Sequence, residues 1–285
     1  MKLGITFAFL SLIFAGINDI VFKKYSIKIR SKGMYIFGIG IVWTIIQFLY
    51  FNINNINLSF DLNSIVYGLI TGLFLTISNI LFIESLTHIN ISSGTTIYRL
   101  NTIGVVILSF IILNEPLGTN KLIGIISGLI AVLILYEINY NNSKTSIIKT
   151  FFLLVIAASL FRAIYGIISK IAILSNADIN SMLIIISLSW IIGGAIYAIF
   201  RENIFDITKK ICIYSMISGI LVFLIVNFLM LAIKYGEASI VIPIANMSFI
   251  LALLISIVLK MESISLRKIF SIFLAIISII LLAKI

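Results

Sequence analysis

The chain has 285 residues, of which 61% are hydrophobic and 11% charged, with a formal net charge of +10. Soluble domains are typically about 45–50% apolar and about 25% charged, so this composition excludes a soluble globular protein and a disordered chain. One cysteine, Cys212, and one histidine, His88, exclude a disulfide framework and predict neither a metal site nor a cofactor. The basic residues lie between apolar runs, so we expect them to face lipid headgroups and to bind no nucleic acid.

Ten apolar runs follow one another along the chain, and a helix that crosses the hydrocarbon needs about 20 residues. The expected helices cover residues 3–23, 34–52, 63–84, 93–113, 120–137, 150–172, 181–200, 211–233, 238–259 and 268–284. Strands are excluded because the runs are continuously apolar rather than alternating with period two. We therefore predict an all-α integral membrane protein with ten transmembrane helices.

An internal repeat is the most specific signal in the sequence. A shift of 147 residues, without a gap, aligns the only two tryptophans, Trp43 with Trp190. It also aligns Lys23 with Lys170, Tyr50 with Tyr197 and Glu115 with Glu262. The pattern predicts one five-helix repeat over residues 1–138, a connecting loop over 139–149 and a second repeat over 150–285. Five is an odd number, so the second repeat must be inverted in the membrane, as in many secondary transporters.

Charge asymmetry gives an expectation for orientation. Lys and Arg gather in the odd-numbered connections, above all at residues 23–32. The positive-inside rule then puts these connections in the cytoplasm and both termini outside.

The end of each repeat carries two copies of one pattern. The first copy is Ser92-Ser93-Gly94, Asn114-Glu115-Pro116-Leu117 and Lys121-Leu122-Ile123-Gly124, and the second is Gly236-Glu237-Ala238-Ser239 followed by Met261-Glu262-Ser263-Ile264. On these residues, and over essentially its whole length, the chain resembles the ten-helix EamA-type members of the drug/metabolite transporter superfamily. Pro243 matches a proline of that family, whereas Thr96 at the equivalent place in the first copy departs from it.

The resemblance implies a membrane carrier of small molecules, commonly an exporter of amino acids or metabolites, and not an enzyme. We expect it in the cell membrane, as a monomer or homodimer whose partners are a small-molecule substrate and the lipid bilayer. The family is usually drawn with both termini in the cytoplasm, which is opposite to the orientation that the charges predict.

Ionisable residues inside membrane spans are costly and normally face the bundle interior or a water-filled path. The first span carries Asp19 beside a helical face of Ser11, Ala15, Asn18 and Phe22. The sixth span repeats the spacing with Arg162 and Tyr165. We expect Asp19 and Arg162 to line one cavity from opposite halves, without a catalytic site. The substrate-binding candidates are Asn18, Asp19, Trp43, Gln47, Asn79, Tyr98, Arg99, Arg162, Tyr165, Trp190, Asn227 and Asn246.

Several of these residues have a structural alternative. Asp19 and an arginine are equally well explained as a structural ion pair, and Arg99 lies close enough to its helix end to reach a headgroup. The tryptophans also suit an interfacial belt, and the asparagines Asn79 and Asn227 suit bonds between helices.

The leading hypothesis is secondary transport, by alternating access, of a small amino-acid-like metabolite that is zwitterionic or anionic. Coupling to a proton or ion, or exchange, would involve Asp19. A first alternative is an organic-cation carrier with an aromatic box of Trp43, Trp190, Tyr98 and Tyr165. A second alternative is a lipid-processing enzyme that uses Asp19 and Glu84.

Overall fold

The computed structural model describes residues 1–26, 30–87, 91–134, 145–203, 207–260 and 263–283. Throughout these residues the regular elements are helices. They are, in chain order, α1 (Lys2–Ser26), α2 (Lys32–Ile53), α3 (Leu62–Ser85), α4 (Ile91–Arg99), α5 (Asn101–Leu113), α6 (Thr119–Ile134), α7 (Thr145–Leu174), α8 (Ile179–Tyr197), the π-helix η1 (Ala198–Glu202), α9 (Lys209–Tyr235), α10 (Ala238–Asn246), α11 (Ser248–Val258) and α12 (Leu266–Ala283).

Seven helical stretches in the described chain are long and apolar enough to cross a membrane. Shorter apolar helices cover Ile97–Leu113 and Thr119–Ile134. The chain is therefore a multi-pass membrane protein. The ten ranges expected from the sequence coincide with helices of the described chain, two of them with a pair of helices each, and their described ends differ by a few residues.

Two of the expected helices are broken, and the breaks are repeat-related. The fourth divides at Leu100 into α4 and α5, and the ninth divides at Met247 into α10 and α11. These two residues are 147 positions apart. At each break a tight turn replaces the regular ladder, with Leu100 N donating to Ile97 O at 3.1 Å and Met247 N to Ile244 O at 3.0 Å. The repeat therefore extends from the sequence to an irregular feature of the backbone.

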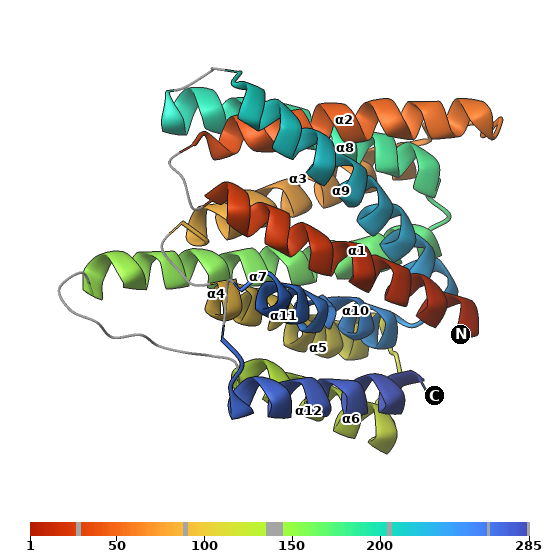
Figure 1. The fold of residues 1–285 in the computed structure, drawn as a ribbon. Coiled ribbons are helices and arrows are strands. Elements are labelled where there is room, and N and C mark those ends of the chain that lie inside the picture. The colour runs from red at the N-terminus through yellow and green to blue at the C-terminus, as the bar shows by residue number, and fades with distance from the viewer. Residues whose placement is uncertain (27–29, 88–90, 135–144, 204–206, 261–262, 284–285) are drawn as a thin grey trace.

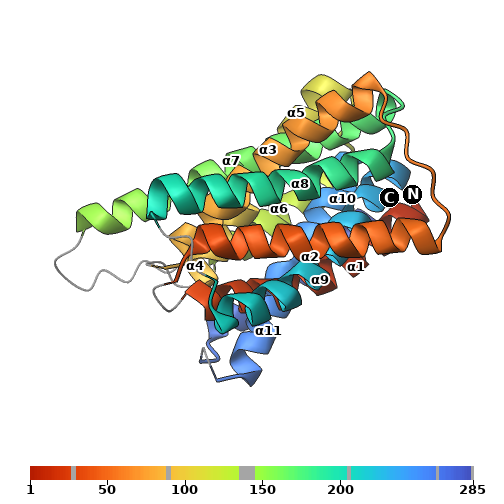
Figure 2. The ribbon, with the colours of Figure 1, turned by 90° about the horizontal axis from the view of Figure 1, so that it is seen from above.

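The helices lie side by side in a bundle, with α2 and α8 along one edge and α6 and α12 along the other (Figure 1, Figure 2). Contacts between the halves follow the repeat. Helix α1 packs on α9, as its counterpart α7 packs on α3, while α2 packs on α8 and α6 packs on α12. The main contacts between the halves thus recur under the 147-residue shift.

Polar caps set several helix ends. The side chains of Ser31, Asp61, Asp178 and Thr208 accept hydrogen bonds from backbone N–H groups at the starts of α2, α3, α8 and α9. The Ser64 hydroxyl, which donates to Asp61, lowers the pKa of that exposed carboxyl from its usual value. These caps satisfy N–H groups that have no partner inside the helix.

Glycines let the helices approach closely within the chain. A Cβ atom at Gly194 would lie 2.4 Å from Phe37 N, and one at Gly33 would lie 2.4 Å from Ala198 N, so α2 and α8 touch backbone to backbone. Gly68 and Gly72 face Ile185 and the Ser189 side chain in the same way. These contacts are internal to one molecule.

Some sequence expectations lie outside the described residues. They concern His88, Glu262 and most of the connecting loop at 139–149. Glu115, the repeat partner of Glu262, has a structural role between the halves. Its carboxylate accepts from Ala238 N at 2.8 Å and Ser239 N at 2.9 Å, and so caps the start of α10.

Candidate functional site

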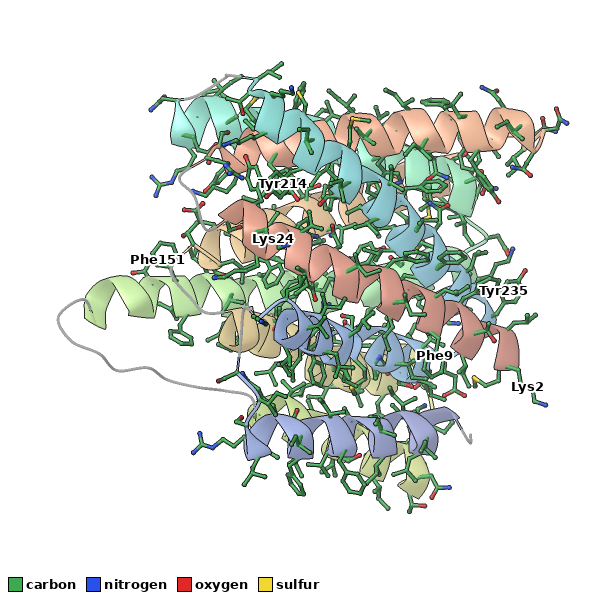
Figure 3. The ribbon with its side chains drawn as sticks, in the orientation of Figure 1. Lys2, Phe9, Lys24, Phe151, Tyr214 and Tyr235 are labelled. Carbon is green, nitrogen blue, oxygen red and sulfur yellow. The ribbon has the colours of Figure 1, made fainter. Side chains whose placement is uncertain are left out.

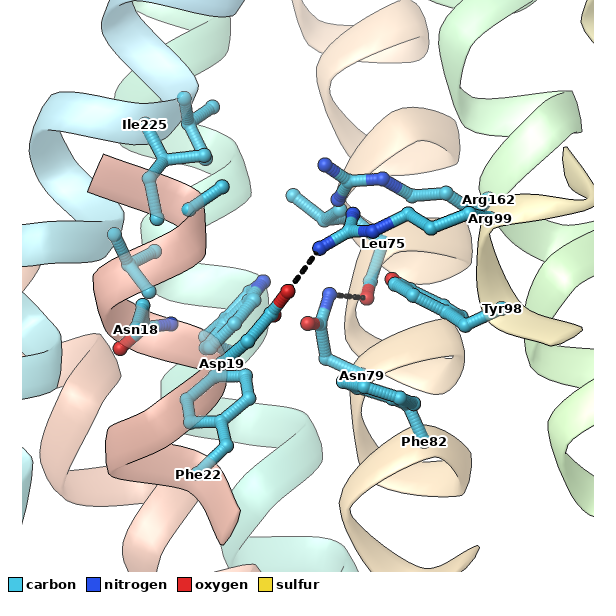
Figure 4. A pocket seen from close by; sticks show the side chains of 14 residues that line it. Asn18, Asp19, Phe22, Leu75, Asn79, Phe82, Tyr98, Arg99, Arg162 and Ile225 are labelled. Carbon is cyan, nitrogen blue, oxygen red and sulfur yellow. Dashed lines mark hydrogen bonds and ion pairs between the residues drawn. The ribbon is translucent and has the colours of Figure 1, made fainter. Parts of the chain in front are cut away.

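A cavity with a volume of about 40 Å³ lies in the middle of the bundle, between α1, α3, α4, α7, α8 and α9 (Figure 4). Both halves of the chain contribute to its wall. Seven of the expected substrate-binding residues line it, namely Asn18, Asp19, Asn79, Tyr98, Arg99, Arg162 and Trp190.

Helix α1 presents one continuous face to this space. Ala15, Asn18 and Phe22 line the cavity at helical spacing, with Asp19 beside them. Ser11, one turn earlier, lines a second cavity, and its hydroxyl donates to Ile225 O on α9 at 3.1 Å. The face expected from the sequence is the one that points inward.

The helix break positions Arg99. It is the last residue of α4, directly before the break at Leu100, and only 4% of its surface is exposed. Its side chain reaches across the cavity toward α1 (Figure 4). The alternative in which Arg99 reaches a headgroup is therefore wrong.

Asp19 forms its ion pair with Arg99, whose Nη2 donates to Asp19 Oδ2. Asp19 is 5% exposed, so both charges are buried. Among the described residues the arginine that pairs with Asp19 is Arg99 rather than Arg162, because the break turns Arg99 toward α1 and gives the carboxylate a partner from its own half. The expectation that Asp19 and Arg162 line one cavity from opposite halves holds.

Arg162 brings a second positive charge to the same cavity, since its side chain and that of Arg99 both line it (Figure 4). The ion pairs of the described residues include none with Arg162, whose guanidinium carbon lies 5.3 Å from the Tyr165 ring centre. Two guanidiniums and one carboxylate leave a net charge of +1 inside the bundle. Arg162 is half-buried, and charge that is partly withdrawn from water is costly unless it is compensated, so the cavity favours an anionic group.

Four buried polar atoms at this centre have no hydrogen-bond partner within the described chain: Asn18 Oδ1, Arg99 Nε, Tyr165 Oη and Trp190 Nε1. Their residues all line the central cavity or the one beside it. Buried polar groups in folded proteins are nearly always bonded, so unpaired groups that converge on a cavity indicate a binding site.

The family model of the EamA-like transporters matches the chain twice, over residues 2–137 and 149–284. The chain belongs to the EamA-like transporter family. It is thus a membrane transporter of the drug/metabolite transporter superfamily.

A solved crystal structure whose description names no function shares the fold. It matches this EamA-like transporter with a TM-score of 0.77 and 11% sequence identity, over 98% of this chain and 95% of the other. No curated protein matches the sequence.

Three expected site residues of the transporter lie behind the cavity rather than in its wall. Trp43 Nε1 donates to Gln47 Oε1 at 3.1 Å, and the Gln47 and Asn227 side-chain amides bond to each other at 3.2 and 2.8 Å. Trp43 also packs edge-on against Trp190, with ring centres 5.8 Å apart. These residues bond to one another and support Trp190 from behind.

The two tryptophans, both at most 1% exposed, differ in their hydrogen bonding. The indole N–H of Trp43 has Gln47 one turn later, whereas Trp190 has Gly194 at the equivalent position. Trp190 Nε1 is therefore left unbonded beside the cavity. The interfacial-belt alternative is wrong for both residues.

A second cavity, of about 10 Å³, adjoins the first, and Arg99 and Arg162 line both. It contains the two remaining expected residues, Tyr165 and Asn246. Its wall is largely the repeat image of the first. Ala15, Asn18, Asp19, Phe82, Tyr98 and Arg99 of the first correspond to Arg162, Tyr165, Gly166, Leu229, Ala245 and Asn246 of the second.

The residues that sequence reasoning did not assign to the site are apolar. They are Leu75, Phe82, Gly166, Val222, Ile225, Val226, Leu229, Ile242 and Ala245. In so apolar a chain nothing distinguishes them from lipid-facing neighbours. Their repeat relation to one another, Leu75 with Val222 and Phe82 with Leu229, was the only available signal.

Proposed function

We propose that the protein is a secondary transporter of small metabolites that carry a carboxylate, either anionic or zwitterionic, across the cell membrane. The observation that carries this proposal is the excess of positive charge in the cavity wall, where the buried Arg99 and the half-buried Arg162 accompany the single carboxylate of Asp19. Guanidinium groups bind carboxylates by charge-assisted, often bidentate hydrogen bonds. Trp190 Nε1 and Tyr165 Oη supply further unbonded groups.

We further infer ten membrane spans in two inverted five-helix repeats, with transport by alternating access. The chain ends lie at one end of the bundle (Figure 1). In Figure 3, Phe151 near the start of α7 lies at the end where Lys24 terminates α1, opposite to Lys2. Opposite directions of α1 and α7, which are repeat partners, support inversion.

The size of the central cavity supports a moving mechanism. A volume of about 40 Å³ suits a few water molecules rather than a metabolite. Substrate binding therefore requires the halves to separate, and the helix breaks at Leu100 and Met247 are suited to this movement because they interrupt the rigid ladder at the cavity.

Asp19 is the coupling candidate. When a proton or a substrate ammonium neutralises its carboxylate, Arg99 loses its counter-charge and becomes available to an anion. Proton binding and substrate binding would then be linked through this ion pair.

A thermal-shift screen first shows which of glutamate, glycine and alanine bind the purified protein. The decisive experiment then measures transport of these amino acids into liposomes with imposed proton or sodium gradients. We expect Arg162→Gln to reduce uptake about tenfold or more, since it removes the uncompensated charge. Arg201→Gln is the matched control, because Arg201 is exposed and lies outside the cavity. Wild-type uptake by a normally folded Arg162→Gln variant would contradict the proposal.

The organic-cation alternative is less well supported by the same geometry. Arg99 and Arg162 lie 5.4 and 5.3 Å from the ring centres of Tyr98 and Tyr165, and Trp43 packs on Trp190. The proposed aromatic box therefore already contacts cations or other rings. Inhibition of transport by choline, without inhibition by amino acids, would favour this alternative.

The lipid-processing alternative requires Asp19 and Glu84 to act together. Glu84 instead lies 3.6 Å from Lys32 Nζ and is absent from the cavity wall. Activity in detergent without vesicles would favour this alternative.

A further inference from the structure

A third and larger cavity lies at the end of the bundle where the chain starts. It has a volume of about 360 Å³ and is lined by the ends of α5, α7 and α9, where Leu113, Leu174 and Tyr235 supply apolar surface. Figure 3 shows Tyr235 at the same end as Lys2. We call this space the vestibule. Its volume is in the range of sites that bind small metabolites.

Helix α7 connects the vestibule with the central site. Its wall residues pass from Leu174 and Lys170 in the vestibule to Gly166 and Tyr165 in the second cavity, and then to Arg162, which lines the second and the central cavity. Lys170 and Arg162 are eight residues apart, which is about 12 Å along a helix. One face of α7 thus carries Lys170 at the vestibule and Arg162 at the central cavity.

The same order recurs on other helices. On α9 the lining passes from Lys234 in the vestibule to Leu229 in the second cavity and Val222 in the central one. On α1, Ser11 lines the second cavity and Asp19 the central one. The three cavities therefore lie in a file along the bundle.

The carboxylates around the vestibule are already bonded. Glu115 caps α10, and the Glu237 carboxylate accepts from the Lys121 ammonium at 2.5 Å. The vestibule wall holds two lysines, Lys170 and Lys234, and these two glutamates. Lys121 lies outside the wall but pairs with Glu237, so the five groups together leave one positive charge.

Lys170 is held in place but keeps donor capacity. Its ammonium donates to the carbonyl oxygens of Ile233 at 2.9 Å and Gly236 at 2.7 Å, which are neutral acceptors. An ammonium has three N–H donors, so one remains for a ligand. The carbonyls fix the lysine at the end of α9 without cancelling its charge.

We propose that the vestibule is an initial binding site for a small anion such as a carboxylate, held by Lys170, from which the anion moves along α7 to Arg162. The anion preference of the vestibule is inferred from Lys170, Lys234 and the bonded carboxylates of Glu115 and Glu237. The passage to Arg162 rests on the transport function proposed above.

The test measures the charge preference of the vestibule with thiol reagents and needs no known substrate. Cys212 is replaced by Ser, and Leu174→Cys, at a position 62% exposed, provides a reporter one turn from Lys170. Its reaction rates with anionic and cationic methanethiosulfonates are each divided by the rate of the same reagent with a free thiol in solution. We expect the anionic reagent to be favoured about tenfold, as charged clefts concentrate counter-ions.

Lys170→Gln should reduce this preference at least about threefold, whereas Lys170→Arg should retain it. The matched control is Lys23→Gln, because Lys23 is the repeat partner of Lys170 and donates to Leu86 O at 3.1 Å. An unchanged preference in Lys170→Gln, or an equal drop in Lys23→Gln, would overturn the vestibule site.

A second reporter tests the route. Gly166→Cys, in the second cavity, should react with reagent supplied from the membrane side that labels Leu174→Cys. Labelling from the other side alone would overturn the route. The outcomes separate the two proposals, since loss of the vestibule preference leaves the effect of Arg162→Gln on transport untouched, and the reverse also holds.

Discussion

The two inner cavities occupy repeat-related places, yet they differ in chemistry. The cavity around Asp19 has a carboxylate and Arg99, whereas the cavity around Tyr165 has Gly166 and Asn246 at the corresponding positions. The scaffold is shared, including the helix breaks at repeat-related residues. The repeat thus builds the space, and the halves differ at the positions that carry the ion pair between Asp19 and Arg99.

The largest expected effect is on folding, and it comes from replacing Gly194, one turn after Trp190, by the residue at the equivalent position of the first half. Gly194→Gln would provide Trp190 with the partner that Gln47 gives Trp43. A Cβ atom there lies 2.4 Å from Phe37 N and 2.9 Å from Gly33 O, which are backbone atoms that cannot move aside. We expect no stably folded protein, as judged by size-exclusion chromatography in detergent.

Gly118→Ala is the control for this substitution, because its added Cβ meets open space. A stable Gly194→Gln protein would show that the close contact between α2 and α8 is not required.

A smaller effect is expected from removing the charge that distinguishes the first cavity. Asp19→Asn leaves Arg99 and Arg162 without a counter-charge, and breaking a buried ion pair from one side costs about 3 kcal/mol or more. Thermal unfolding should detect this loss. Adding Arg99→Gln should restore part of the stability, because one of the two unpaired charges is then gone. A double variant no more stable than Asp19→Asn would contradict the charge balance.

The smallest of the three effects follows from giving the second cavity a carboxylate of its own. Gly166→Asp places an acid one turn from Arg162, where the nearest side-chain atom to a new Cβ is the flexible end of Ile242 at 2.8 Å. We expect uptake of anionic substrates to fall about tenfold, which corresponds to about 1.4 kcal/mol, while the protein stays folded.

Gly166→Ala, which adds the Cβ without the charge, should transport normally in the same liposome assay. Equal activity in the aspartate and alanine variants would show that the difference between the cavities does not set selectivity.

Much of this arrangement was predictable from the sequence. Apolar run lengths located the helices, and the 147-residue shift placed Asp19 and Arg162 at one cavity. The ion-pair partner of Asp19 was not predictable, because it depends on a helix break at Leu100. No proline or glycine adjacent to Leu100 predicts that break. In the second half, Pro243 precedes the corresponding break at Met247.

The inward face of α1 was predictable, but the rotation of α2 and α9 was not. Gln47 and Asn227 look like site residues, but they bond to each other behind Trp190. In a chain that is apolar on nearly every face, periodicity does not show which face is buried against protein and which meets lipid. Close packing between helices decides it, through contacts such as that of Gly40 with the Ile191 backbone.

The tryptophan pair has a practical consequence for spectroscopy. The chain has only two tryptophans, and they lie in edge contact at the cavity, one with a bonded indole N–H and one without. Intrinsic tryptophan fluorescence therefore originates from Trp190 in the wall of the central cavity and from Trp43 directly behind it. The unlabelled wild-type protein already carries an optical reporter of changes at that cavity.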